Sequence, residues 1–110
     1  MKPRNTPVLV QVNYGFDMTP EAYVGAVEPY AESVAAVPGL RWKIWLVDEE
    51  EREAAGIYLF EDAVQARAYL KGPILSPFLR NPAIHDVSVR QSSIVSAPTA
   101  ITRGPVHELV

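Results

Sequence analysis

The 110-residue sequence contains no cysteine, and this absence excludes several kinds of site at once. Disulfide bonds, thiolate nucleophiles and cysteine-ligated metal centres all require a side chain that the chain lacks. Histidine is scarce as well: only His85 and His107 occur, and His107 falls in the terminal segment. A mononuclear iron or zinc site built from one chain is therefore not expected, and we predict no metal ligands.

Long apolar runs, a basic stripe and the common catalytic motifs are also missing. No segment approaches the roughly 20 apolar residues of a membrane span, and the start has no signal-peptide pattern. The net charge is −3 with acidic and basic residues interspersed, which argues against nucleic-acid binding. P-loop, GxGxxG, GxSxG and HExxH patterns do not occur. We expect a cytoplasmic protein with no nucleic acid and no membrane among its partners.

Four segments rich in β-branched and aromatic residues are predicted to be strands. They cover residues 8–13, 40–47, 55–60 and 84–94. The acidic residues 48–51 are too charged to be buried, so we interpret them as a hairpin loop. Their spacing is not that of a calcium-binding loop.

Two helical segments lie between these strands. The first begins at Thr19, a good N-cap, with Pro20 at the first helical position. Pro29 lies inside this segment, which predicts a kink or two short helices that meet at residue 28. Residues 61–62 start the second helix, and its spacing places Val64, Ala68, Tyr69 and Leu70 on the core face. A short extra turn is expected over residues 74–79.

The element order β-α-β-β-α-β is typical of an α+β, ferredoxin-like fold with an antiparallel sheet. Residues 1–94 are expected to form this single domain. Residues 95–110 are expected to form a C-terminal tail that packs on a partner subunit.

Both faces of the central strands are apolar. In the strand of residues 40–47, Ile44 and Leu46 point one way, and Trp45 and Val47 point the other. Two helices cover only one face of a sheet, and a large uncovered apolar face is rare on a monomer. We therefore predict a homodimer in which two open sheet faces pack together as a dimeric α+β barrel and enclose an apolar pocket.

Polar and aromatic side chains on the strands supply candidate site residues. If the valines of the first strand face the helices, the residues between them face the partner sheet. The candidates on this inner face are Gln11, Asn13, Lys43, Trp45 and Tyr58. An aromatic cavity with a few hydrogen-bonding groups is the usual composition of a small-molecule site.

His85 is a further candidate, although the phase of its strand stays open. One face carries His85, Val87, Val89 and Gln91, and the other carries Asp86, Ser88 and Arg90. Each candidate also has a structural explanation: Trp45 and Tyr58 as packing residues, and Lys43 as a chain that extends to the sheet edge.

Several segments resemble the YdhR-like monooxygenase family. They are residues 38–45 with their WKxW pattern, residues 55–60 with GIYLF, and residues 68–70, together with residues 8–16 and 28–33. The resemblance covers most of residues 8–94. It implies a dimeric α+β barrel related to cofactor-independent monooxygenases that oxidise aromatic polyketides. His85 departs from the family pattern, in which an acidic residue is more usual.

The resemblance implies an enzyme with no cofactor, whose partners are a small aromatic or polycyclic phenol and O₂. In this hypothesis Lys43, Tyr58 and Asn13 are catalytic, with Lys43 stabilising a phenolate. The substrate contacts are Trp45, Gln11, Phe60 and His85.

Three alternatives share the same predicted dimer. One is a non-enzymatic ligand-binding or stress protein, and another is an isomerase or ring-opening enzyme with Asp86 or His85 as its base. The third is a purely structural protein whose inner face is packed solid.

Overall fold

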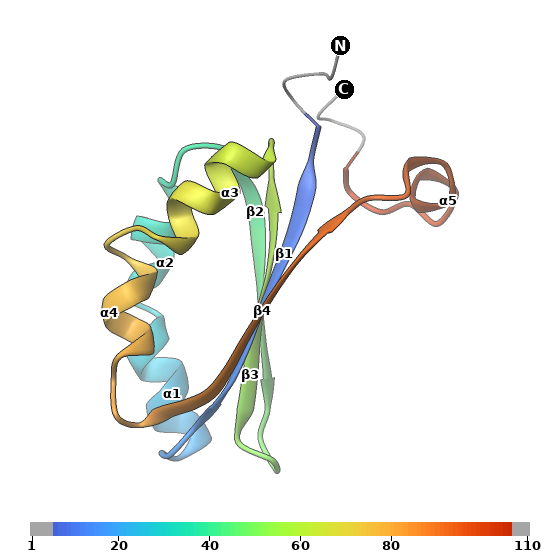
Figure 1. Ribbon diagram of the computed structural model, residues 1–110. Coiled ribbons are helices and arrows are strands. Elements are labelled where there is room, and N and C mark those ends of the chain that lie inside the picture. Colours follow the sequence, from blue (N-terminus) through green and yellow to red (C-terminus); the bar gives the residue numbers. More distant parts are fainter. Residues whose placement is uncertain (1–5, 107–110) are drawn as a thin grey trace.

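A computed structural model describes residues 6–106 of the chain (Figure 1). The strands are β1 (Val8–Phe16), β2 (Leu40–Asp48), β3 (Glu53–Phe60) and β4 (Ile84–Ser93). The helices are α1 (Pro20–Val27), α2 (Tyr30–Ala35), α3 (Ala63–Leu70), α4 (Leu75–Leu79) and α5 (Ser96–Ile101). Within these described residues, no helix has the length and apolar character needed to cross a membrane. His107 lies outside the described residues.

The strands form one antiparallel sheet in the order β2-β3-β1-β4. Helices α1 to α4 all lie on one face of this sheet, and the opposite face carries no helical layer over most of its length (Figure 1). We call these the covered face and the open face. The predicted α+β, ferredoxin-like fold is therefore confirmed.

Local capping explains where the helices begin and end. The hydroxyl of Thr19 accepts a hydrogen bond from the Ala22 amide at 3.1 Å, and Pro20 occupies the first position of α1. The helix ends at Val27, and Pro29 caps the separate helix α2, as predicted. At α3, an Asp62 carboxylate oxygen accepts from the Gln65 amide at 2.8 Å.

The core lies between the covered face and the helices. Its most deeply buried members are Val10, Val12, Phe16, Tyr58 and Phe60. The prediction that Val64 faces this core is wrong, because Val64 is 70% exposed. The same prediction is wrong for the exposed Ala68 but right for Tyr69, which α3 buries together with Ala66 one turn earlier.

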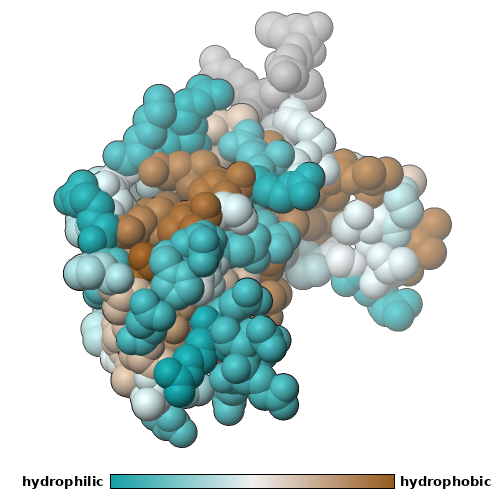
Figure 2. Space-filling model, turned by 60° about the horizontal axis from the view of Figure 1, so that its bottom comes forward, coloured by the Kyte–Doolittle hydropathy of each residue, from teal (hydrophilic) through white to brown (hydrophobic). Residues whose placement is uncertain are grey.

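The C-terminal segment holds a short helix, α5, that the sequence did not predict. Helix α5 projects beyond the sheet edge (Figure 1) and has no buried residue. Val95 and Ile101 are 69% and 76% exposed, and the protruding segment on the right of Figure 2 carries hydrophobic patches among neutral and hydrophilic ones. The chain then returns to the opposite edge strand, where the Trp42 indole donates a hydrogen bond to the Pro105 carbonyl at 3.0 Å.

Candidate functional site

Lys43, Trp45, Tyr58 and Phe60 lie on the covered face. Tyr58 is directly opposite Val10 on one side and Lys43 on the other, and opposed residues share a face. Phe60 lies opposite Val8 and is fully buried. The prediction that Lys43, Trp45 and Tyr58 face a partner sheet is therefore wrong. Both faces of β2 and β3 are apolar, so alternation alone did not indicate which face the helices cover.

Gln11 and Asn13 lie on the open face, as predicted, between the buried valines of β1. The Gln11 amide donates to the Asn13 side-chain oxygen at 3.1 Å, and the Asn13 amide is 3.4 Å from the Ser88 hydroxyl. The sheet thus separates the predicted site residues into two groups that do not meet.

The fourth strand contains a bulge that changes its phase. Its pairing with β1 shifts between Asn13 and Gly15, and Asp86 has a left-handed φ of 55°. His85 consequently lies opposite Gly15, and Ser88 lies opposite Asn13, so both are on the open face. The grouping of His85 with Val87 and Val89 is therefore wrong, because regular alternation cannot account for the extra residue.

A cluster of four side chains on the covered face contains Lys43, Trp45, Tyr58 and Tyr69, and we call it the Lys43 cluster. The Lys43 ammonium lies 3.3 Å from the centre of the Trp45 ring and 4.5 Å from that of Tyr58. Gly56 leaves room for it, because a Cβ at that position would be 2.7 Å from the Lys43 Cε. Within residues 6–106, no hydrogen bond or ion pair reaches this ammonium.

Two physical effects act on the protonation of Lys43. Burial away from water disfavours the charged form and lowers its pKa from 10.5 to about 7. The faces of the two aromatic rings attract the ammonium and act in the opposite direction. Lys43 is therefore an amine that exchanges its proton near neutral pH.

Four buried tyrosines form two hydrogen-bonded pairs in the core beside the Lys43 cluster. The hydroxyls of Tyr58 and Tyr69 are 2.9 Å apart, and those of Tyr14 and Tyr23 are also in contact. Burial raises the pKa of all four phenols, so they stay protonated at neutral pH. Of these four residues, the sequence marked Tyr69 only as a core position. The need of a buried phenol for a partner was the signal that could have suggested these pairs.

The Lys43 cluster borders a small cavity of about 20 Å³ between the sheet and the helices, and this cavity is partly open to the surface. This volume holds about one water molecule. A groove of about 280 Å³ lies outside it, on the surface between α1 and β2. Trp45 and Val27 line both spaces, and Trp45 is 37% exposed. The Trp45 ring is therefore part of the wall between the cavity and the solvent.

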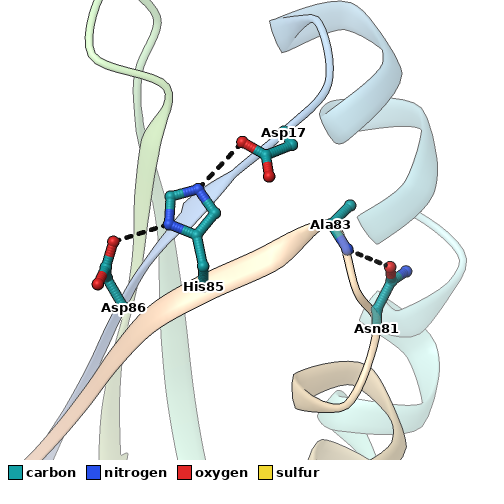
Figure 3. Close-up of polar contacts among 5 residues, drawn as sticks. All are labelled: Asp17, Asn81, Ala83, His85 and Asp86. Carbon is teal, nitrogen blue, oxygen red and sulfur yellow. Dashed lines mark hydrogen bonds and ion pairs between the residues drawn. The ribbon is translucent and has the colours of Figure 1, made fainter.

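The open face has its own hollow of about 470 Å³, and His85 is part of its lining. The imidazole contacts Asp86 through Nδ1 at 2.8 Å and Asp17 through Nε2 at 3.2 Å (Figure 3). The hydrogen bond with Asp86, assisted by the charge of Asp17, raises the pKa of His85. The ring covers Gly15, where a Cβ would be 2.4 Å from the His85 Cε1.

The turn before β4 brings these groups together. The Asn81 side chain accepts a hydrogen bond from the Ala83 amide at 2.9 Å (Figure 3), and the Asp17 amide donates to the Ala83 carbonyl at 2.8 Å. In residues 6–106, no group of histidine and carboxylate side chains has the arrangement of a metal site.

The antiparallel sheet with helices on one face makes this an α+β protein of the ferredoxin-like class. Residues 9–105 match the sequence profile of the family described as "Putative mono-oxygenase ydhR". Because the match spans most of the chain, the protein belongs to this family. No curated protein matches the sequence.

Solved structures with the same fold have different activities. SnoaB, a cofactor-independent oxygenase from Streptomyces nogalater, is 15% identical with a TM-score of 0.66, over 81% of this chain and 93% of SnoaB. A dimeric ferredoxin-like protein from Thermobifida fusca is 16% identical with a TM-score of 0.66, over 83% and 93%. The hydroxynitrile lyase of Passiflora edulis is 13% identical with a TM-score of 0.64, over 84% and 96%. At these identities the similarity establishes the fold alone.

Proposed function

We propose that the protein is a cofactor-independent monooxygenase that oxidises a small aromatic or polycyclic phenol at the Lys43 cluster. Membership of the monooxygenase family supports the reaction class. The observation that carries the proposal is an amine without an acidic partner, enclosed by the rings of Trp45 and Tyr58. An aromatic substrate fits such a site because its rings stack on these side chains.

The proposed chemistry begins with a proton. The neutral Lys43 amine removes the acidic proton of a phenol or anthrone, and the resulting ammonium stabilises the negative charge on the ring. The electron-rich anion then transfers an electron to O₂, and the two radicals combine as a peroxide. Loss of water leaves the carbonyl product, so that one CH₂ group and one O₂ give one C=O group and one water. The Tyr58 and Tyr69 hydroxyls orient the substrate oxygens.

A substrate larger than one water needs the cavity to open. Trp45 is the proposed gate, because its ring separates the cavity from the surface groove along α1. Rotation of this ring away from Lys43 would join the two spaces. The groove residues Val24, Val27 and Val47 would then hold the outer part of a polycyclic substrate.

The open face is the proposed contact of a homodimer. Ile44 and Leu46 are 48% and 46% exposed on this face, which is unusual for large apolar side chains on a central sheet. The protruding α5 adds exposed Val95 and Ile101 on the same side, and we propose that this segment packs on the partner subunit. The fold relative from T. fusca is itself dimeric.

Oxygen uptake with anthrones and hydroquinones tests the proposed reaction. We expect uptake with the wild-type protein and a loss of about 10²–10⁴-fold in Lys43→Met, the range that general-base catalysis contributes. Lys71→Met, at the exposed end of α3, is the matched control and retains full activity. Equal activity in both variants would remove Lys43 from the mechanism.

A thermal-shift measurement with the same compounds separates the enzyme from a non-enzymatic ligand-binding protein. A ligand at about 100 times its dissociation constant stabilises the folded state by about 2.7 kcal/mol. Stabilisation without oxygen uptake would favour the non-enzymatic alternative. Asn13→Ala and Lys43→Met distinguish the two faces of the sheet. If Asn13→Ala abolishes oxygen uptake and Lys43→Met leaves it unchanged, the reaction takes place on the open face.

Sedimentation velocity tests the proposed dimer. We expect the wild-type protein to sediment as a dimer and Ile44→Glu to sediment as a monomer, because a carboxylate cannot be buried in an apolar interface without a partner. Val64→Glu places the same charge on an exposed site of α3 and should leave the dimer intact. Dissociation by both variants would contradict the assignment of the open face.

A further inference from the structure

Lys43 has a combination of properties that a proton-transfer role does not require. It is a primary amine on a strand, walled by apolar and aromatic groups, with no carboxylate within contact distance among residues 6–106. Because no carboxylate is paired with the ammonium, loss of the Lys43 proton does not leave a buried carboxylate without its partner. A desolvated amine of this kind is a good nucleophile in its neutral form, because its lone pair is then available to attack an electrophile.

We propose that the Lys43 amine condenses with small aldehydes or ketones, and that the Lys43 cluster is therefore a covalent carbonyl-binding site. The proposal does not depend on oxygen chemistry. It requires an amine that can lose its proton inside a largely apolar recess. The rings of Trp45 and Tyr58 line this recess, and Gly56 leaves space beside the Lys43 chain.

The condensation balances without an oxidant, a reductant or another reactant. The lone pair of the Lys43 Nζ forms a bond to the carbonyl carbon, and the electron pair of the C=O bond moves to oxygen. A proton passes from nitrogen to that oxygen, and loss of the hydroxyl group as water leaves a C=N bond. The adjacent phenols of Tyr58 and Tyr69 are protonated at neutral pH, so the site keeps hydrogen-bond donors for the departing oxygen.

The geometry also restricts the carbonyl compound. The cavity next to the amine holds about one water molecule, so any carbonyl compound, acetaldehyde included, requires Trp45 to rotate toward the surface groove. Aliphatic or aromatic carbonyl compounds without charge are favoured, because a charged group would lose its hydration against apolar walls.

Reductive alkylation with acetaldehyde and cyanoborohydride tests the proposal on the intact protein. The chain has three lysines, Lys2, Lys43 and Lys71, and peptide mass spectrometry assigns an added ethyl group to each one. At pH 7 we expect Lys43 to react at least about tenfold faster than the exposed Lys71, because an ordinary lysine has a pKa near 10.4 and is almost entirely protonated. The preference should shrink as the pH rises to 10, where ordinary lysine side chains also begin to lose their protons.

Two controls keep the result specific to the site. Unfolding the protein in urea should abolish the preference, because the Lys43 amine then returns to water. Gly56→Ala should slow alkylation of Lys43 without changing Lys71, since the added methyl group meets the Lys43 Cε. A Lys43 rate equal to or below that of Lys71 at pH 7 would overturn the proposal. That outcome would leave the oxygen-uptake result unaffected, so the two hypotheses fail separately.

Discussion

The covered and open faces of the sheet use the same four strands for different purposes. On the covered face, every buried phenol has a hydrogen-bond partner among the described residues, and the rings stack closely: Phe16 and Tyr23 lie 4.4 Å apart and nearly parallel. On the open face, Gln11, Asn13 and Ser88 form a polar strip beside the exposed Ile44 and Leu46. The comparison shows that polar groups alone do not mark the site. The group that we propose to be reactive, Lys43, lies on the face that forms the core.

The difference in burial should appear as a difference in stability, and this is the largest effect that we expect. Phe60→Ala on the covered face should lower the free energy of unfolding by about 3–5 kcal/mol, because it leaves a cavity in a dense core. Ile44→Ala on the open face should cost about 1 kcal/mol or less in the monomer. Urea unfolding at low protein concentration measures both. Similar losses would mean that the open face is as well packed as the covered one.

The burial of Lys43 should make the free energy of unfolding depend on pH, with a total change of several kcal/mol. Its pKa is about 7 in the folded protein against 10.5 for an exposed lysine, so the unfolded state binds more protons between these values. The free energy of unfolding should therefore rise with pH by up to about 1.4 kcal/mol per unit between pH 7 and 10, and the destabilising contribution is largest below pH 7.

Lys43→Met should flatten this dependence, because the thioether has no proton to exchange. It should also raise stability at pH 7, since no ammonium remains to be desolvated. Lys71→Met is the control and should keep the wild-type slope. A slope that persists in Lys43→Met would assign the pH dependence to other groups.

The His85 contacts on the open face should respond to Gly15→Ala with a smaller effect. The new methyl group displaces the imidazole, weakens its contacts with Asp17 and Asp86, and lowers the pKa of His85 toward 6.5. In the wild type, the raised pKa stabilises the folded state below pH 6.5, and this contribution disappears as the pH rises through the folded value. NMR titration of the ring measures the change, with His107 as an internal reference. An unchanged pKa would mean that the ring keeps both carboxylates.

The ion pair at the end of the sheet should matter least. Arg41 contacts Glu61 at 2.8 Å, but the Arg41 side chain is 47% exposed. Glu61→Gln should therefore change the free energy of unfolding by about 0–1 kcal/mol, and less at high salt. Thermal unfolding at two salt concentrations measures it. A larger loss would indicate that this corner supports the covered face.

Local signals in the sequence were sufficient for the element order and for the helix break. Thr19, Asp62 and Pro29 act through contacts within one or two turns, so their effects follow from neighbouring residues. The family pattern in residues 38–45 and 55–60 also indicated the family correctly. These predictions needed no knowledge of which strands pair.

The placement of the site required information that neighbouring residues do not carry. Whether Lys43 and Tyr58 face the helices depends on their register with Val10, which strand pairing sets. The position of His85 depends on the bulge at Asp86, because one extra residue reverses the alternation beyond it. The contact between Trp42 and Pro105 joins residues far apart in the chain and had no local signal.

The positions of the two tryptophans give the protein a pair of natural fluorophores, one for each face. Trp42 holds the returning C-terminal segment on the open side, and the Trp45 ring lies beneath the Lys43 ammonium. Replacing either one by phenylalanine leaves a single tryptophan whose surroundings are known, and excitation at the long-wavelength edge of its absorption avoids the tyrosines. The emission of Trp45 then follows the filling of the cavity and the charge on the amine, and that of Trp42 follows the release of the C-terminal segment. One spectrometer can thus observe both sides of the sheet separately, without any attached dye.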